Sequence, residues 1–183
     1  MRSLLSVAEQ RRELVVDKAL LTNRLCDTLK YYPQALDWFG QRDTVLFCDF
    51  LTCWPALLAV RRARRTTLEE FFHAHHGRRA NLIEARLVSI GAATPLTEDT
   101  GIVAPNRLYV LALVEQLRTV LTAIDRFDRE IATVAGTLPH YTLVQGLSGA
   151  GPQLAPRLLA TFGEQRERFH GADELQKHSG IAP

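Results

Sequence analysis

The sequence predicts an all-α fold, and three observations carry that prediction. Apolar residues recur at spacings of three and four through residues 3–31, which is the period of an amphipathic helix. No segment shows the sustained alternation of apolar and polar residues that is typical of a half-buried strand. A second apolar set repeats every seven residues, at Val103, Val110, Leu117, Ile124, Ile131 and Leu138. We therefore expect two long amphipathic helices that pair as an antiparallel hairpin, with a small helical insert at 33–95.

The first long helix is expected to span residues 3–31. Ser6 and Glu9 match a capping box, which places the start of the ordered helix at Ser6. Pro33 ends it, because proline disfavours α geometry in the residue before it. Arg12 and Thr22 fall on the strict heptad seam, which favours a packed helix of a hairpin over a clean two-stranded coiled coil.

The insert is expected to consist of short helices at 34–39, 45–54 and 56–60, a helix from a second capping box at Thr66 to about His76, and a helix at 78–89. Aromatic residues recur at helical spacing among aliphatic ones, which predicts an aromatic core rather than platforms for stacking nucleic-acid bases. These residues are Trp38, Phe39, Phe47, Phe50 and Trp54.

The second long helix is expected to run through residues 103–138. Pro105 either kinks this helix or marks its first turn. Gly136, followed by Pro139, is expected to close it. A domain boundary is placed after residue 138, which divides the chain into a helical assembly segment at 1–138 and a second domain at 139–183.

Composition bounds the class of protein. The net charge is only +2, but 19 of the 22 cationic residues are arginine. Arginine bonds phosphates and bases bidentately, so this bias favours a nucleic-acid partner; a GC-rich genome would enrich arginine equally. Cys26, Cys48 and Cys53 form no C-x-x-C pair and are expected to be buried thiols in a reducing compartment. Neither a membrane helix nor a signal peptide is predicted, so a cytoplasmic location is expected.

Two stretches are candidate nucleic-acid contacts. The densest charge run contains Arg61, Arg62, Arg64 and Arg65, which could neutralise several phosphates or could form a solvated connector. The turn Gly149-Ala150-Gly151-Pro152-Gln153 could present free backbone amides to a phosphate at the start of the following helix. The same letters also make an ordinary turn between two helices, with Pro152 in the first turn of the second.

A metal site is not favoured by the sequence. Glu69, His73 and His76 fall at i, i+4 and i+7, so they share one face of a helix. Three ligands on one short helix without a supporting carboxylate are weak evidence, and a solvent-exposed polar face is the preferred interpretation. We therefore expect no metal or other cofactor in this chain, and no catalytic residue is assigned.

Motifs distributed along the chain resemble a known family. In the last forty residues they are Leu147 to Pro152, Leu158 to Gly163, Arg168-Phe169, Ala172, Leu175 and Gly180 to Pro183. Further upstream they are Leu20 to Leu25, Tyr32 to Leu36, Phe50-Leu51, Trp54-Pro55 and Leu96 to Asp99. Together they resemble the coiled-coil segment and the start of the C-terminal domain of the insertion-sequence-one-ten transposases, DEDD-type enzymes associated with a bridge RNA.

The resemblance implies three parts: a ribonuclease-H-like domain with four acidic residues that hold Mg²⁺, a coiled-coil assembly segment, and a C-terminal domain with a serine nucleophile. This sequence matches the second part and the start of the third, the latter expected to be a partial helix-hairpin-helix-like domain. Neither Ser148 nor Ser179 matches the nucleophile's place. By resemblance we expect a truncated, catalytically inert fragment that binds DNA and a guide RNA and assembles with its own copies or with intact transposase. The alternative is a non-enzymatic helical protein that oligomerises or binds RNA to regulate a transposase.

Overall fold

The computed structural model describes residues 2–75, 80–162, 170–171, 173–174 and 177. Within these ranges the regular structure is entirely helical, without a strand, which confirms the all-α prediction. The chain forms two compact units, Met1–Glu13 with Ile124–Pro183, and Leu14–Ala123. This grouping by packing does not test the domain boundary after residue 138, which stays a prediction. None of the described helices is both long enough and apolar enough to cross a bilayer.

Two long helices match the expected ones. Helix α1 is Arg2–Thr28, followed by the 3-10 turn η1 at Leu29–Tyr31, and helix α7 is Thr100–Gly136. The capping-box prediction for Ser6 was wrong, since α1 already begins at Arg2. Burial explains the difference, because Leu4 is fully buried against α7 and this contact extends the helix past the cap.

Pro105 lies inside α7, in its second turn rather than its first. The helix begins earlier because an acidic side chain caps it: Asp99 Oδ1 accepts a hydrogen bond from the Gly101 amide at 2.8 Å. An early helix position tolerates proline well, since few intrahelical hydrogen bonds are lost there.

Both units contain part of an antiparallel helix pair. In the unit Met1–Glu13 with Ile124–Pro183, Leu4 packs with Ile131 and Ala135, while Arg11 pairs with Asp128 at 2.5 Å. The later residue of α1 contacts the earlier residue of α7, so the two helices run antiparallel here. The seven-residue repeat of α7 is the buried face, as predicted. Val110, Leu117, Ile124 and Ile131 are buried, and Val103 and Leu138 are partly buried.

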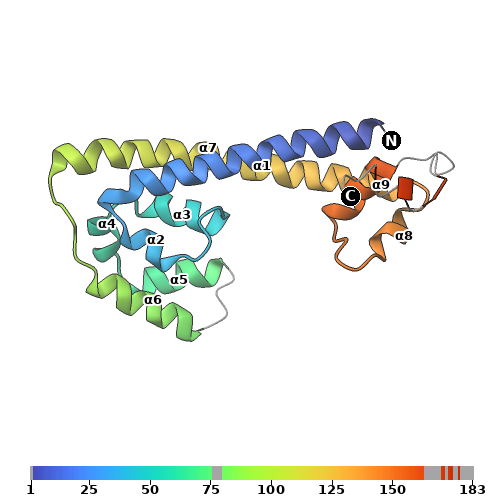
Figure 1. Ribbon diagram of the computed structural model, residues 1–183. Helices are drawn as coiled ribbons and strands as arrows, with labels where there is room; N and C mark the ends of the chain where they lie inside the picture. The colour runs from blue at the N-terminus through green and yellow to red at the C-terminus, as the bar shows by residue number, and fades with distance from the viewer. Residues whose placement is uncertain (1, 76–79, 163–169, 172, 175–176, 178–183) are drawn as a thin grey trace. The chain divides into compact units, whose positions relative to one another are not determined.

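The predicted insert is a group of short helices that lie together beside the paired helices of the unit Leu14–Ala123 (Figure 1). They are α2 Gln34–Trp38, α3 Val45–Cys53, α4 Leu57–Arg61, α5 Arg65–Ala74 and α6 Ala80–Ala92. Thr44 caps α3, with its side chain accepting a hydrogen bond from the Phe47 amide. The second capping-box prediction was wrong, because α5 begins at Arg65 and its N-cap Arg64 makes no side-chain capping bond.

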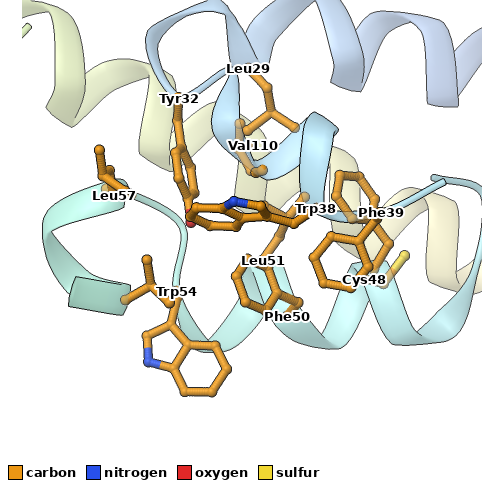
Figure 2. Packing of buried hydrophobic residues seen from close by; sticks show 14 of the residues in the cluster. Leu29, Tyr32, Trp38, Phe39, Cys48, Phe50, Leu51, Trp54, Leu57 and Val110 are labelled. Atoms are coloured by element: carbon orange, nitrogen blue, oxygen red, sulfur yellow. The ribbon is translucent and has the colours of Figure 1, made fainter. Parts of the chain in front are cut away.

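The predicted aromatic residues form the centre of this unit's core. Phe50 is fully buried, with its ring 4.8 Å from that of Phe39 and 6.0 Å from that of Trp38 in an edge arrangement. Figure 2 shows these rings packed with Leu51, and Trp54 is the C-cap of α3, the helix that contains Phe50. Such edge and offset ring pairs stabilise a core beyond their burial alone. The preference for a core over base stacking is therefore confirmed.

All three cysteines were predicted to be buried thiols, and the structure confirms this fully for one of them. Cys48 is buried among the aromatic rings, Cys26 is partly buried, and Cys53 is exposed. All three are free thiols. The burial expected of Cys53 was wrong, because this residue ends α3 on the helix face that turns away from the core.

In the unit Met1–Glu13 with Ile124–Pro183, the continuously described stretch after α7, residues 137–162, contains two short helices. They are α8 Tyr141–Gln145 and α9 Leu154–Phe162, and they pack together through Val144, Ala155 and Leu159. The turn that contains Gly149 joins these two helices, and α8 was not among the helices expected from the sequence. The motif residues Gly163, Arg168, Phe169 and Gly180–Pro183, and most of the short helix expected at 172–178, lie outside the described residues.

Candidate nucleic-acid interface

The arginine run occupies the junction of two short helices. Arg61 ends α4, Arg62 is its C-cap, Arg64 is the N-cap of α5, and Arg65 is the first residue of α5. Buried apolar residues hold the junction on both sides, with Val60 completely buried and Leu68 only 4% exposed. The core therefore fixes the backbone while the four arginine side chains stay exposed.

The four arginines differ in their electrostatic partners. Arg65 donates to Glu69 at 2.8 Å and also pairs with Glu84 of α6. Its charge is thus already offset by two carboxylates. Arg61, Arg62 and Arg64 form no ion pair within the part of the chain that the structure describes. These three are the arginines of the run best placed to meet a phosphate.

The glycine turn between α8 and α9 is closed largely by its own backbone. Gly149 adopts a φ of 83° in the left-handed region, which glycine enters without strain. The Ala150 amide donates to the Leu147 carbonyl at 3.0 Å, and the Gly151 amide donates to Gly149 at 2.9 Å. These two amides are consequently less available to a phosphate than the sequence suggested.

The helix after the turn begins at Leu154, two residues later than the predicted start at Pro152. The Gly151 carbonyl accepts from the amides of Leu154 and Ala155 at 3.0 and 2.9 Å, so Gly151 carries out the role expected of a cap. Gln153 turns its side-chain amide toward Asp128, 3.2 Å from Oδ1. The turn and the arginine run belong to different units, and each is a separate candidate contact.

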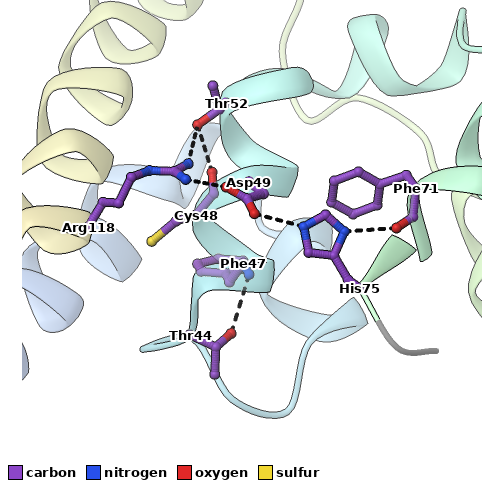
Figure 3. A network of polar contacts seen from close by, with 8 residues as sticks. All are labelled: Thr44, Phe47, Cys48, Asp49, Thr52, Phe71, His75 and Arg118. Atoms are coloured by element: carbon purple, nitrogen blue, oxygen red, sulfur yellow. Dashed lines mark hydrogen bonds and ion pairs between the residues drawn. The ribbon is translucent and has the colours of Figure 1, made fainter. Parts of the chain in front are cut away.

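A polar network that the sequence did not predict joins three helices. Asp49 of α3 hydrogen-bonds to His75 Nε2 at 2.7 Å and pairs with Arg118 of α7 (Figure 3). His75 Nδ1 lies 2.8 Å from the Phe71 carbonyl oxygen, and Arg118 donates to Thr52 Oγ1 at 3.2 Å. Both ring nitrogens of His75 are thus engaged.

The network shifts the pKa values of the two titratable groups at its centre, His75 and Asp49. Burial lowers the pKa of His75, but its hydrogen bonds to the Phe71 carbonyl and Asp49 raise that pKa more, to a net increase. Burial raises the pKa of Asp49, while hydrogen bonds from His75 and Arg118 outweigh it and lower that pKa. Burial also raises the pKa of the neighbouring Cys48 thiol to about 11. A protonated thiol is a poor nucleophile. The hydrogen bonds and ion pairs of Asp49 join α3 to the end of α5 and to α7.

Two of the three residues of the disfavoured metal site, Glu69 and His73, lie within the described residues. Glu69 is engaged with Arg65, and His73 is exposed, while His76 lies outside the described residues. Over those that are described, no three histidine, cysteine, aspartate or glutamate residues gather in a way that could hold a metal ion.

Two curated proteins resemble this chain along almost its whole length. The uncharacterized 44.8 kDa protein of insertion element IS116 from Streptomyces clavuligerus is 25% identical over 185 residues. The mini-circle protein from Streptomyces coelicolor named as the candidate transposase for IS117 is 25% identical over 183 residues. One relative is named for an insertion element, the other as a transposase.

Each similarity covers 97% of this chain but 44% of the relative. The chain therefore spans less than half the length of the curated relatives it matches. No protein-family model matches the sequence. No solved structure matches it either.

Proposed function

We propose that this chain is the nucleic-acid-binding and assembly part of an insertion-element transposase. The observation that carries the proposal is the similarity, over 97% of the chain, to a protein named as a transposase and to one from an insertion element. The motifs that resemble the insertion-sequence-one-ten transposases support the same assignment. The proposal gives these residues binding and assembly, with DNA or a guide RNA as the ligand, and gives them no step of strand cleavage.

The exposed arginines supply a physical basis for binding. Arg61, Arg62 and Arg64 project from a junction that the core holds in place, and their charges are not offset by carboxylates of the described chain. A planar guanidinium bonds a phosphate through two parallel hydrogen bonds. Cations that neutralise phosphates release counterions, so binding through this run should weaken steeply as salt rises.

Exposed apolar residues on α1 favour an assembly role as a second candidate function. Val16 and Leu20 are 48% and 58% exposed. Leu20 also lines a groove of about 440 Å³ with Leu21 and Val120, flanked by Asp17 and Arg24. An apolar strip edged by opposite charges suits a second helix. A protein that only oligomerises, and regulates a transposase in that way, would use this surface without the arginine run.

A gel-shift comparison tests the proposal. The wild-type chain, the triple variant Arg61→Gln/Arg62→Gln/Arg64→Gln and the matched control Arg2→Gln/Arg126→Gln/Arg129→Gln are each titrated against a 40-base-pair DNA duplex and a 40-nucleotide RNA in low salt. Both triple variants remove three exposed arginines. We expect the run variant to bind at least about tenfold more weakly than the control, because lost phosphate contacts dominate such affinities.

Two outcomes would contradict this function. Absence of any shift by the wild-type chain at low salt would remove nucleic-acid binding altogether. Equal affinities of the two triple variants would show that the run is not the contact. A chain that self-associates in sedimentation but shifts neither nucleic acid would support the regulatory oligomer instead.

A further inference from the structure

A pocket of about 260 Å³ lies beside the end of α4, within the unit Leu14–Ala123. Two arginines from distant parts of the sequence line it, Arg62 after α4 and Arg107 in α7. Thr97 and Tyr31 add hydroxyl groups, and the other lining residues are aliphatic or proline. None of the described residues that line the pocket is acidic. A small concave site with an apolar wall and a few converging polar groups is the usual form of a ligand site.

The charges of the side chains that line the pocket favour an anionic ligand. Arg62 and Arg107 are exposed, and neither makes an ion pair with a carboxylate of the described chain. Two cationic side chains that line one pocket attract an anion and disfavour a cation there. Tyr31 does not supply that anion, because burial, opposed by the charge of Arg107, raises the pKa of its hydroxyl to about 12.

The hydroxyl groups are already oriented by neighbouring backbone groups. Thr97 Oγ1 accepts a hydrogen bond from the Asp99 amide at 3.2 Å, which leaves the Thr97 hydroxyl hydrogen available as a donor. Tyr31 instead donates its hydroxyl hydrogen to the Pro55 carbonyl at 2.5 Å. The nearby Asp99 carboxylate is occupied by the Gly101 amide and does not line the pocket. The site therefore offers two cationic donors and one neutral donor.

We propose that this pocket binds one backbone phosphate of a nucleic-acid strand, held by Arg62 and Arg107 with the Thr97 hydroxyl, while the aliphatic wall contacts the adjoining sugar or base. The proposal rests on the proposed function and adds Arg107 and Thr97 to its contacts. Nucleic acid is favoured over an acidic peptide because Arg62 also belongs to the exposed run with Arg61 and Arg64. A strand bound along the run can therefore place one phosphate in the pocket.

The test is a binding titration with a 5′-fluorescein-labelled strand of twenty thymidines, followed by fluorescence anisotropy in low salt. The Arg107→Gln variant should bind roughly tenfold more weakly, the usual effect of losing a hydrogen bond to a charged group. Its salt dependence should flatten by about 0.7 in the logarithmic slope, the value for one phosphate of a single strand.

A matched pair at Ala59 controls for folding. Ala59 is an exposed residue of α4 that lines the pocket. Ala59→Glu places a carboxylate beside Arg62 and should weaken binding more than the nearly isosteric Ala59→Gln, which adds the same bulk to the pocket without the charge. Circular dichroism and thermal melting confirm that each variant folds.

The results separate this inference from the proposed function. Failure of the wild-type chain to bind this strand, while it still shifts the duplex or the RNA, would overturn the pocket alone, whereas failure with all three would defeat both. Wild-type binding with unchanged affinity in Arg107→Gln and in Ala59→Glu would overturn the pocket alone. Polyglutamate of equal charge that competes as well as the unlabelled strand, and loses that ability in Arg107→Gln, would show a general anion site and would likewise overturn the nucleic-acid assignment.

Discussion

Asp49 is the residue through which three helices of one unit are joined. It lies on α3 and is about one quarter exposed, where it meets His75 at the end of α5 and Arg118 on α7. A carboxylate that accepts two charge-assisted hydrogen bonds retains much of the stabilisation that exposed ion pairs lose to water. Removing either partner would leave the other polar groups of the network poorly satisfied.

The network predicts a pH window for stability. The pKa of His75 is raised above 6.5 in the folded chain, so its contribution is complete below that pH and is lost as pH rises through the folded pKa. The pKa of Asp49 is lowered below 3.8, so its contribution is present above that pH and is lost as pH falls through the folded pKa. Both contributions coincide between the two unperturbed values.

Urea unfolding of His75→Gln and of the wild-type chain measures this effect. The difference in unfolding free energy between them should be largest at about pH 5 to 6 and should shrink toward about pH 9, as the wild-type histidine loses its proton. His73→Gln is the control, because His73 is exposed on the same helix. A difference that grows with rising pH would contradict the assigned network.

Some residue-level features could be predicted from sequence and others could not. The aromatic core was predictable because its members recur at helical spacing within one short stretch. The network was not, since its hydrogen bonds join positions 26 and 66 residues apart that share no motif. Arg107 could not be predicted as a site residue for the same reason, because only the folded chain brings it to the pocket that Arg62 lines.

At the scale of elements, tertiary contacts decided where helices begin. The seven-residue repeat located α7 correctly because periodicity reports which face is buried. Both capping-box predictions placed the start of the helix wrongly, because a capping box takes account of local sequence alone. Burial of Leu4 extends α1 to Arg2, and the ion pairs of Arg65 with Glu69 and Glu84 hold the start of α5 one residue before Thr66.

The turn between α8 and α9 gives a prediction for a single glycine. Gly149→Ala should lower the free energy of unfolding by about 1–2 kcal/mol, because an alanine side chain is strained in the left-handed region. Gly151→Ala is the matched control. A Cβ atom would meet open space at both positions, and Gly151 has no positive φ.

Chemical denaturation of the two variants reports the difference directly. Equal stability of Gly149→Ala and Gly151→Ala would show that the turn does not hold Gly149 in the left-handed conformation. It would also weaken the case that this glycine is required by the turn geometry rather than by a bound phosphate.

At the scale of the whole molecule, the candidate contacts are distributed over both units. The arginine run and the pocket of Arg62 and Arg107 lie in the unit Leu14–Ala123, whereas the glycine turn lies in the other. The turn satisfies much of its own backbone, while three exposed arginines of the run form no ion pair among the described residues. The run and pocket are therefore the stronger candidates for binding, and the turn the weaker one.

The share of each relative that this chain matches limits the functions that can be claimed for it. Similarity covers nearly all of this chain but less than half of each relative. The central claim therefore concerns nucleic-acid binding by the residues of this chain. Sequence motifs pointed toward a transposase, while the structure identified which arginines of the run form no ion pair among the described residues and which pocket Arg62 lines.

The most direct test of the central claim is the salt dependence of DNA binding by the wild-type chain, with affinity measured by anisotropy on a fluorescent duplex at several salt concentrations. If Arg61, Arg62, Arg64 and Arg107 meet phosphates, the logarithm of the association constant should fall with the logarithm of salt at a slope of about −3 to −4, near −0.9 for each phosphate neutralised. A slope near zero, or no measurable binding at low salt, would contradict the claim that this chain binds nucleic acid through its exposed arginines.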